Sequence, residues 1–416
     1  MKKIISRLAC VSFTALALGA CGNKKKQESG INVLIWVAEN VVETTKLQLT
    51  SFKEKLKTDY GYTVNYTVNA QSEQKAASQI MSDMESGADI YCFAQNQLAA
   101  LNRAGALDRL SDKRAAAAAE KNDAASVEAT KAPGSNKMRA YPLTSDNGYF
   151  MYYDKRVVKQ ESLGDLSKII ADVTAANRRI SMEYESGWYT YSFFSGAGCV
   201  SEWNADEDGN FVSYNDTYNS PQGLNAIKGL KEIVTAKSGD LIVNSDSAAD
   251  FASGSAVVIS GTWDYSIAKD NLGENLGAAE LPSFTVNENT YHLGSFYGSK
   301  LMGVKPQTDA DKAAICHMTA EYLTDYDAQV ERFNKNGWGP CNLKAQALDA
   351  VKNAEHLLAL KAQNTHGTLQ GQFPESWWPI ADALGADVRK AGASATDAQL
   401  QKILTDYAAS IAGLIK

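Results

Sequence analysis

The chain has 416 residues, of which 44% are hydrophobic and 21% charged, and its formal net charge at pH 7 is −7. Beyond Lys26 it has no cluster of basic residues, which excludes nucleic acid as a main partner because phosphate binding requires a basic face. After the first apolar stretch, no run approaches the ~20 apolar residues that a membrane span requires, so we expect the rest of the chain to be soluble.

The first residues have the composition of an export signal. Lys2, Lys3 and Arg7 precede an apolar run that ends in Leu18-Gly19-Ala20-Cys21, and this ending resembles a bacterial lipobox. The resemblance implies that residues 1–20 are a lipoprotein signal peptide, that Cys21 carries lipid such as palmitate, and that residues 21–30 form a polar tether. An uncleaved anchor helix is the alternative. We therefore expect a lipid-anchored protein of the cell envelope whose folded part lies outside the cytoplasm.

The residues after the tether number about 385, which exceeds what one hydrophobic core usually organises and predicts two domains. Strand and helix patterns alternate in the first part. Strands are predicted at 32–37, 62–68 and 89–93, with helices over 49–60 and through Ile80 to Met84. This order predicts a parallel sheet covered by helices on both faces, with ligands gathering in the segments after Val37 and Phe93.

Further along the chain, the patterns are less regular. The later predicted elements are a surface helix over 114–125, a strand-like region over 138–153, a helix over 166–176, an aromatic run over 188–194, an acidic turn over 204–210, a helix over 221–233, a buried strand over 256–260, and helices over 310–323 and 328–336.

The remaining cysteines carry no metal signature. Cys92, Cys199, Cys316 and Cys341 lie far apart, without a CxxC or a Cys/His spacing. The acidic turn lacks the glycine and glutamate positions of an EF-hand loop. We expect isolated buried thiols, leave a disulfide open as the alternative, and expect no metal and no cofactor.

Several short segments, taken in order, resemble those of one family. They are 87–91 with 101–107, 140–143 with 152–155, 251–256 with 261–263, 337–340, and 375–378. Together, behind the lipobox, they resemble the sugar-type (family 1) extracellular solute-binding proteins of ABC importers. The resemblance implies an α/β, two-lobed periplasmic-binding-protein-like fold of type II, with a ligand cleft between the lobes. Lobe one would comprise 31–144 plus 298–341, and lobe two 145–297 plus 342–416.

Aromatic side chains are the first candidates for a sugar site, because a pyranose presents an apolar face to a flat ring and a rim of hydroxyls to polar groups. Trp188, Trp263 and the pair Trp377 and Trp378 fall at predicted loop or strand-end positions that the family uses. Trp188 and its neighbour Tyr189 match the family's second-lobe platform, with core packing as the alternative. Neighbours on a helix or strand cannot both face one cleft, so one of Trp377 and Trp378 is expected to stack on ligand, and we favour Trp378.

Polar candidates follow from the same resemblance. Phe93 occupies the place of a family aromatic, while Asn96 replaces an acidic residue of the maltose-binding member, and Glu39 with Asn40 replaces its acid–lysine pair. The other expected cleft residues are Gln95, Asp146, Asp264 and Trp338. An ordinary solvated loop, or for Trp338 lid packing, is the alternative.

The resemblance implies a monomer that captures a mono- or oligosaccharide and delivers it to the transmembrane permease subunits of an ABC importer, without catalytic residues. Two alternatives remain. The same fold could bind another solute, such as a polyamine or a metal chelate, or the chain could be an exported glycoside hydrolase, which needs only two suitably spaced carboxylates. Against the hydrolase, the sequence contains no GxSxG, no HExxH and no phosphate loop.

Overall fold

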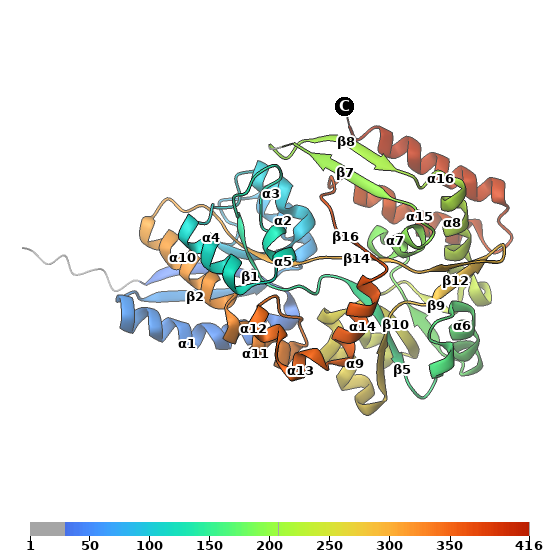
Figure 1. Cartoon of the computed structure of the whole chain (residues 1–416), viewed down its shortest axis with the longest axis horizontal. Coiled ribbons are helices and arrows are strands. Elements are labelled where there is room, and N and C mark those ends of the chain that lie inside the picture. The colour runs from blue at the N-terminus through green and yellow to red at the C-terminus, as the bar shows by residue number, and fades with distance from the viewer. Residues whose placement is uncertain (1–29, 207, 416) are drawn as a thin grey trace, which may run out of the picture.

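A computed structural model describes residues 30–206 and 208–415. The predicted signal peptide, the predicted lipidation site Cys21 and the predicted tether up to Ser29 lie outside the described residues. Two α/β lobes lie side by side, with the early strands in one and the green and yellow segments of the chain in the other (Figure 1). The two-lobed α/β architecture is as predicted. Within the described part of the chain, no helix has both the length and the apolar character to cross a membrane.

Lobe one is built on a five-stranded sheet in the order β2-β1-β3-β15-β4. Its strands are β1 (Ile31–Val37), β2 (Val64–Ala70), β3 (Ile90–Ala94), β4 (Ala140–Pro142) and β15 (Lys300–Val304). Strand β1 pairs in parallel with both β2 and β3, which confirms the predicted parallel arrangement, whereas β15 is antiparallel to β3. Its helices are α1 (Val42–Tyr60), α2 (Glu73–Ser82), α3 (Leu98–Arg103), α4 (Asp112–Lys121), α5 (Ala124–Glu128), α10 (Ala310–Leu323) and α11 (Tyr326–Asn336).

Lobe two is built on a second five-stranded sheet in the order β11-β5-β10-β6-β9. Its strands are β5 (Tyr149–Asp154), β6 (Arg179–Ser181), β9 (Ile242–Val243), β10 (Ser255–Gly261) and β11 (Leu276–Ala279). Its helices are α6 (Leu166–Ala175), α7 (Gly187–Gly196), α8 (Pro221–Val234), α9 (Tyr265–Leu272), α14 (Glu355–Asn364), α15 (Trp377–Ala391) and α16 (Asp397–Ala412), and two short helices, α12 (Leu343–Gln346) and α13 (Asp349–Lys352), precede α14.

Three two-stranded ribbons complete the fold. They are β7 (Ser201–Ala205) with β8 (Phe211–Asp216), β12 (Ser283–Val286) with β13 (Asn289–His292), and β14 (Ser295–Tyr297) with β16 (Gly367–Leu369). The first of them contains the predicted acidic turn and extends from lobe two toward α3 of lobe one (Figure 1). There Arg103 Nη1 donates to the Gly209 carbonyl at 3.3 Å.

Local signals explain where several helices begin and end. Helix α1 stops at Gly61, whose left-handed φ of 72° lets its N–H bond back to the last turn. Ser111 caps α4 by accepting from the Arg114 N–H, and that helix buries none of its side chains. The predicted surface helix over 114–125 is nevertheless two helices, because the chain breaks at Asn122 and α5 starts afresh.

Two other sequence interpretations need correction. The strand-like region 138–153 is split into β4 and β5, which belong to different sheets, so the residues between them cross from one lobe to the other. The aromatic run 188–194 is helix α7 rather than a loop or strand end, and each of its residues is buried. A helix that is apolar on all sides belongs inside a core, which is why it lacks an amphipathic period.

The chain crosses between the lobes three times, after β4, before β15 and after α11. Backbone hydrogen bonds link these crossings side by side: the Ser145 N–H donates to Gly339 at 3.2 Å, and the Asn147 N–H donates to Gly298 at 3.0 Å. Such a bundle of short adjacent segments can act as a hinge. The four described cysteines are all buried and unpaired, in agreement with the isolated thiols that the sequence predicted.

Candidate functional site

A cleft with a volume of about 1120 Å³ lies between the two lobes. Its lining comes from both sheets, and most of it lies just beyond the carboxyl ends of parallel strands, where ligands of open α/β sheets bind. The volume is at or above the range of ordinary small-molecule sites, so the cleft can hold a ligand of several rings.

Each wall follows from the strands behind it. On the lobe-one wall, Glu39 and Asn40 follow β1, residues 71–75 follow β2, and Asn96 follows β3. On the lobe-two wall, the lining residues lie after β6, β9 and β10 and in the first turns of α7 and α15. They include Glu183 and Glu185 after β6, Asp246 after β9, Trp263 and Asp264 after β10, Trp188 on α7, and Trp378 and Asp382 on α15.

The structure brings seven of the thirteen predicted site residues together in this cleft: Glu39, Asn40, Asn96, Trp188, Trp263, Asp264 and Trp378. The segments after the first and third strands therefore face the cleft, as the parallel-sheet argument predicted. Contact between these side chains and a solute stays a prediction.

The three cleft tryptophans are held by different means. Trp263 lies in the turn that follows β10, and its carbonyl accepts a 2.7 Å hydrogen bond from Asn40 Nδ2 of the other lobe. Trp188 begins α7 and stacks on Phe296 with ring centroids 5.2 Å apart. Only 6% of Trp188 is exposed, and its Nε1 has no hydrogen-bond partner among the described residues. Trp378 packs against its neighbour Trp377 at 4.8 Å and stays half-buried.

Trp377, Phe93 and Tyr189 do not line the cleft, although the sequence placed them there. Trp377 is fully buried, and its Nε1 donates to the Tyr407 hydroxyl at 3.0 Å, so Trp378 is the member of the pair that faces the cleft, as we expected. Phe93 lies inside lobe one because its strand, β3, is central and buried on both faces. Tyr189 is buried one step round α7 from Trp188, and its hydroxyl donates to Asp246 at 2.8 Å.

Gln95, Asp146 and Trp338 also lie behind the cleft lining, at the hinge. Asp146 is 2% exposed, and its Oδ2 accepts hydrogen bonds from Thr262 Oγ1 at 2.6 Å and from the Gly339 N–H at 2.5 Å. Both donors go to Oδ2, whereas the buried Oδ1 has no hydrogen-bond partner among the described residues, and Asp146 is not part of the cleft lining.

The side-chain amide of Gln95 is also hydrogen-bonded to protein groups. Its Oε1 accepts from the Ser299 N–H at 2.8 Å, and its Nε2 donates to the Gln370 carbonyl at 2.6 Å. Trp338 is buried at the third crossing, and the Lys300 Nζ lies over its ring at 3.9 Å from the centroid. Trp338 therefore lies behind the cleft and supports Lys300, which is part of the lining.

Asp264 is the one predicted carboxylate of the lobe-two wall. Its Oδ2 accepts from the Ala248 N–H at 2.8 Å and from Ser260 Oγ at 2.9 Å. Burial raises the pKa of its carboxyl to about 6, against the two hydrogen bonds that lower it. The group therefore changes charge in the mildly acidic range.

Lys300 is a cleft residue that sequence reasoning missed. It is 3% exposed, its Nζ lies 5.2 Å from the Trp263 ring centroid as well as close to Trp338, and it is 3.6 Å from Glu73 Oε1. The ammonium is held by two aromatic faces and one carboxylate, so it has little freedom to reach a ligand.

Other missed lining residues are acids and amides: Glu73, Glu183, Glu185, Asp246, Glu375, Asp382, Asn147 and Gln370. Glu183 and Asp246 follow β6 and β9, which span three and two residues. Strands this short leave no periodic pattern, so the strand-end signal that would have located these acids was absent from the sequence.

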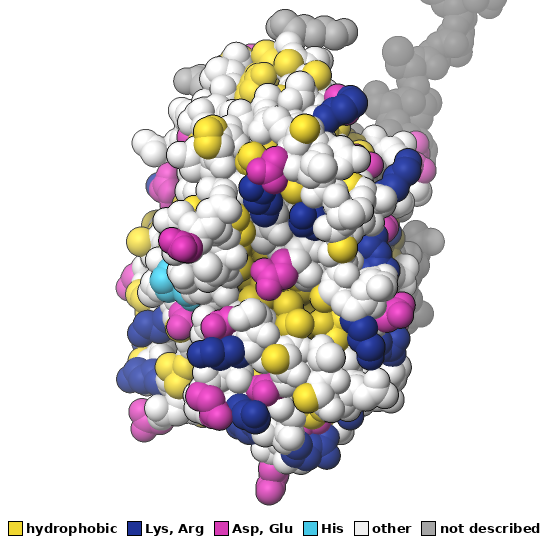
Figure 2. Space-filling view, turned by 90° about the vertical axis from the view of Figure 1, so that its right-hand side faces the viewer, with side chains coloured by type: hydrophobic (Ala, Val, Ile, Leu, Met, Phe, Trp, Pro, Cys, Tyr) yellow, Lys and Arg dark blue, Asp and Glu magenta, His cyan; other side chains and the backbone are white. Residues whose placement is uncertain are grey.

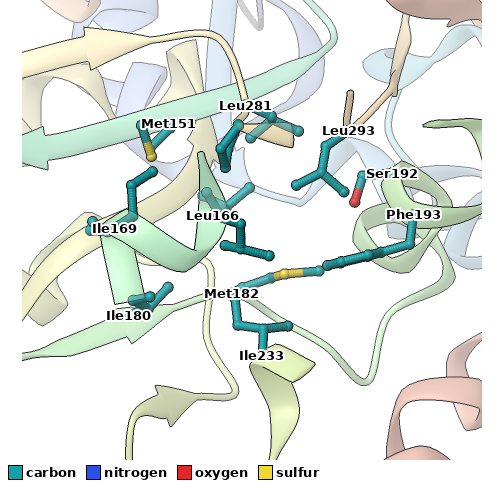
Figure 3. Close-up of a pocket in the computed structure, with 13 residues that line it drawn as sticks. Met151, Leu166, Ile169, Ile180, Met182, Ser192, Phe193, Ile233, Leu281 and Leu293 are labelled. Carbon is teal, nitrogen blue, oxygen red and sulfur yellow. The ribbon is translucent and has the colours of Figure 1, made fainter. Parts of the chain in front are cut away.

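A second cavity, of about 20 Å³, lies inside lobe two. Figure 3 shows apolar side chains of several elements converging on it, with Ser192 the polar exception, and the Ser192 hydroxyl already donates to the Tyr189 carbonyl at 2.7 Å. A space of this size and lining is a packing void and cannot hold a sugar ring.

One group of possible metal ligands lies outside the cleft. Glu280, His292 and His366 bring their ligand atoms within 4.8 Å of one another. The two imidazoles stack face to face, with centroids 3.6 Å and planes 14° apart. A metal bound by both would have to lie near both ring planes, which parallel planes at that separation forbid, so the observed geometry is not a ready-made metal site.

The comparisons with known proteins agree with this architecture. The profile of a family described as bacterial extracellular solute-binding protein matches residues 50–359. No curated protein sequence matches. The ligand-free maltodextrin binding protein MalE1 from L. casei BL23 superposes with a TM-score of 0.72 and 19% identity, over 92% of this chain and 99% of that one.

Two further solved structures also superpose on nearly the whole chain. The maltose-maltodextrin binding protein of Alicyclobacillus acidocaldarius gives a TM-score of 0.73 at 16% identity and covers 92% of this chain and 100% of its own. The GacH receptor of Streptomyces glaucescens GLA.O gives 0.73 at 16% identity, with coverages of 93% and 99%. At these identities the likeness establishes the fold.

Proposed function

The chain belongs to the bacterial extracellular solute-binding protein family, and on that premise we propose that it captures a carbohydrate between its lobes and delivers it to the permease of an ABC importer. The ligand is a mono- or oligosaccharide that stacks on Trp263, Trp188 and Trp378. Closure of the lobes around it then gives the permease a form to recognise, which requires that the sugar bind the closed form more tightly than the open one.

The observation that carries this proposal is the combination of aromatic faces and polar side chains in the lining of one cleft. Three tryptophans supply flat apolar surface, and the buried Trp188 Nε1 has no hydrogen-bond partner among the described residues. Asn96 and Asn147 add amides to the same lining. Sugar hydroxyls satisfy such donors and acceptors, whereas a purely apolar ligand would leave them unpaired.

The solved structures with this fold support the same ligand class. Their names describe maltodextrin-binding and maltose-maltodextrin binding proteins, and one of them was obtained in complex with acarbose. We further propose that the protein is a monomer without enzymatic activity, anchored to a membrane through lipid on Cys21 with its folded part outside the cytoplasm, and with lobe boundaries at 144/145, 297/298 and 341/342.

Thermal unfolding of protein beginning at Ser29, against a panel of mono- and oligosaccharides, polyamines and amino acids, tests the proposal. A sugar at 100 times its Kd should stabilise the native state by ~2.7 kcal/mol. Trp263→Ala should abolish that shift, while Trp36→Ala, which removes a partly buried tryptophan outside the cleft lining, should retain it. Stabilisation by polyamines alone, or appearance of cleaved sugar in the mixture, would refute the proposed function.

A further inference from the structure

The lining of the cleft is strongly acidic. Among the described residues that form it, two are lysines, none is an arginine or a histidine, and eight carry carboxyl groups: Glu39, Glu73, Glu183, Glu185, Asp246, Asp264, Glu375 and Asp382. The outer face of the molecule at the right of Figure 1 is different, because its acidic and basic side chains are interspersed (Figure 2). The excess of acid is therefore a property of the cleft.

The two lysines neutralise little of the lobe-two wall: the charge of Lys75 lowers the pKa of Glu183, but burial and the nearby acids outweigh it and the pKa is raised. Lys300 is enclosed by Trp338, Trp263 and the nearby Glu73 carboxylate. Lys75 is exposed in the first turn of α2, on the opposite wall. The lobe-two lining itself contains acidic residues and no basic ones within the described chain.

The acids of the lobe-two wall are close enough to affect one another. Burial, and then the nearby charges of Asp246 and Asp382, raise the pKa of Glu183. Among the described residues, these neighbours receive hydrogen bonds from neutral donors only: the Tyr189 hydroxyl donates to Asp246, and the Gly187 N–H donates to Asp382 at 2.7 Å. Neutral donors satisfy lone pairs but leave the repulsion between the carboxylates in place.

A second feature of the same wall favours a sugar over a bare polyamine. Trp188 lines the cleft together with these acids, and its buried Nε1 has no hydrogen-bond partner among the described residues. This donor requires an acceptor such as a hydroxyl or ring oxygen. A bare polyamine has no such acceptor when it is protonated, whereas a carbohydrate does.

We propose that the solute is a carbohydrate that carries at least one protonated amine, held by Glu183, Asp246 and Asp382 beside the cleft tryptophans. This inference rests on the proposed function and narrows its substrate class to amino sugars or oligosaccharides that contain them. The ammonium donates to the carboxylates, and the sugar ring stacks on Trp188 or Trp263 and accepts from the indole N–H.

The same charges make closure depend on the ligand. Closing the hinge brings Glu39 and Glu73 of lobe one toward the acidic wall of lobe two, and the Coulomb energy between like charges grows as water leaves the space between them. A bound ammonium offsets this repulsion. Without a cation in the cleft, the open form is favoured, so an empty protein does not mimic a loaded one.

Binding of matched amino sugars tests the inference by calorimetry. The probes are glucosamine, galactosamine and the β-1,4-linked glucosamine tetramer, each compared with its fully N-acetylated form, together with maltotetraose and spermidine. We expect at least one free-amine sugar to bind about tenfold or more tightly than its acetylated form, a preference that weakens as salt rises. Glu183→Gln and Asp246→Asn should each remove most of that preference, while Glu161→Gln, an exposed acid outside the cleft lining, should not.

The outcomes separate this inference from the proposed function. If neutral sugars bind as tightly as their amine forms, or if no amine-bearing sugar binds, the inference is overturned, and any neutral sugar that binds leaves the carbohydrate function standing. If spermidine binds and no sugar does, both are overturned. Asp246→Asn retains an acceptor oxygen for the Tyr189 hydroxyl, and both amides have nearly the volume of the acids they replace. Loss of preference in a variant with an unchanged unfolding midpoint therefore reports the charge and not the fold.

Discussion

The two walls of the cleft are made from the same kind of structure and differ in what they leave unpaired. Both lie at the carboxyl ends of parallel strands. The lobe-one wall carries both lysines and joins one of them to Glu73, whereas the lobe-two wall carries the three tryptophans and acids without a basic residue in its described lining. The strand-end position fixes where a ligand binds, and the residues placed there decide which ligand it is.

The largest expected effect on stability distinguishes Trp377, buried behind the lobe-two wall, from Trp378, which lines that wall. Trp377→Ala should lower the free energy of unfolding by about 3–5 kcal/mol, since it removes a fully buried tryptophan and leaves Tyr407 without its donor. Trp378→Ala should change stability by less than ~1 kcal/mol and weaken sugar binding about thirtyfold, as loss of an aromatic anchor does. Urea unfolding and calorimetry measure the two effects, and equal destabilisation by both variants would contradict this division.

Lys300→Met should remove one positive charge from the lobe-one wall and so bring its charge closer to that of the lobe-two wall. It leaves Glu73, whose side chain is 13% exposed, without its nearest cation, and we expect a loss of ~2–3 kcal/mol in the free energy of unfolding. The preference for an amine-bearing sugar over its acetylated form should then rise, because the cleft becomes more acidic. The double variant with Glu73→Gln should recover part of the stability, and strictly additive losses would show that the pair is not coupled.

The pH dependence of stability should report the acidic wall. Asp264, with a native pKa of about 6 against an unfolded value near 4, holds a proton in the native state that the unfolded chain releases between those values. Its contribution to stability is therefore present below pH 4 and is lost as pH rises to 6, by ~2 kcal/mol.

Buried His356, whose pKa is lowered to about 4, changes stability in the opposite sense over the same range. The measurable quantity is thus the difference between the wild type and Asp264→Asn, in urea unfolding from pH 4 to pH 7. The variant should gain on the wild type as pH rises, and parallel pH profiles would contradict the raised pKa.

The smallest effect should come from the contact outside both walls. Arg103→Ala removes the hydrogen bond from α3 to the β7–β8 ribbon and should cost about 0.5–1 kcal/mol of stability. The ratio of affinities for free and acetylated amino sugars should not change, since neither wall loses a charge. A changed ratio would show that the ribbon contributes to ligand choice.

Much of this architecture is accessible from sequence because it depends on local patterns. The alternation of strands and helices predicted the first sheet, and the turn after the buried strand 255–261 located Trp263. The sequence could not reveal Glu183 and Asp246 as lining residues, because they follow strands too short to show a period. Nor could it reveal that Asp146 and Gln95 hydrogen-bond to protein groups at the hinge. Those outcomes depend on which segments meet in three dimensions, and only the tertiary structure contains that information.

Asp146 joins two of the interlobe crossings to the turn that carries Thr262, through a single carboxylate oxygen. Its neighbours Ser145 and Asn147 are bonded to the other two crossings, so we expect the three linked segments to restrict closure to rotation about one axis. Any solute that closes the cleft then turns the lobes about the same line, whatever its own shape. We expect the permease to recognise the angle between the closed lobes and not the chemical structure of the bound solute, so that one docking surface can serve sugars of different length.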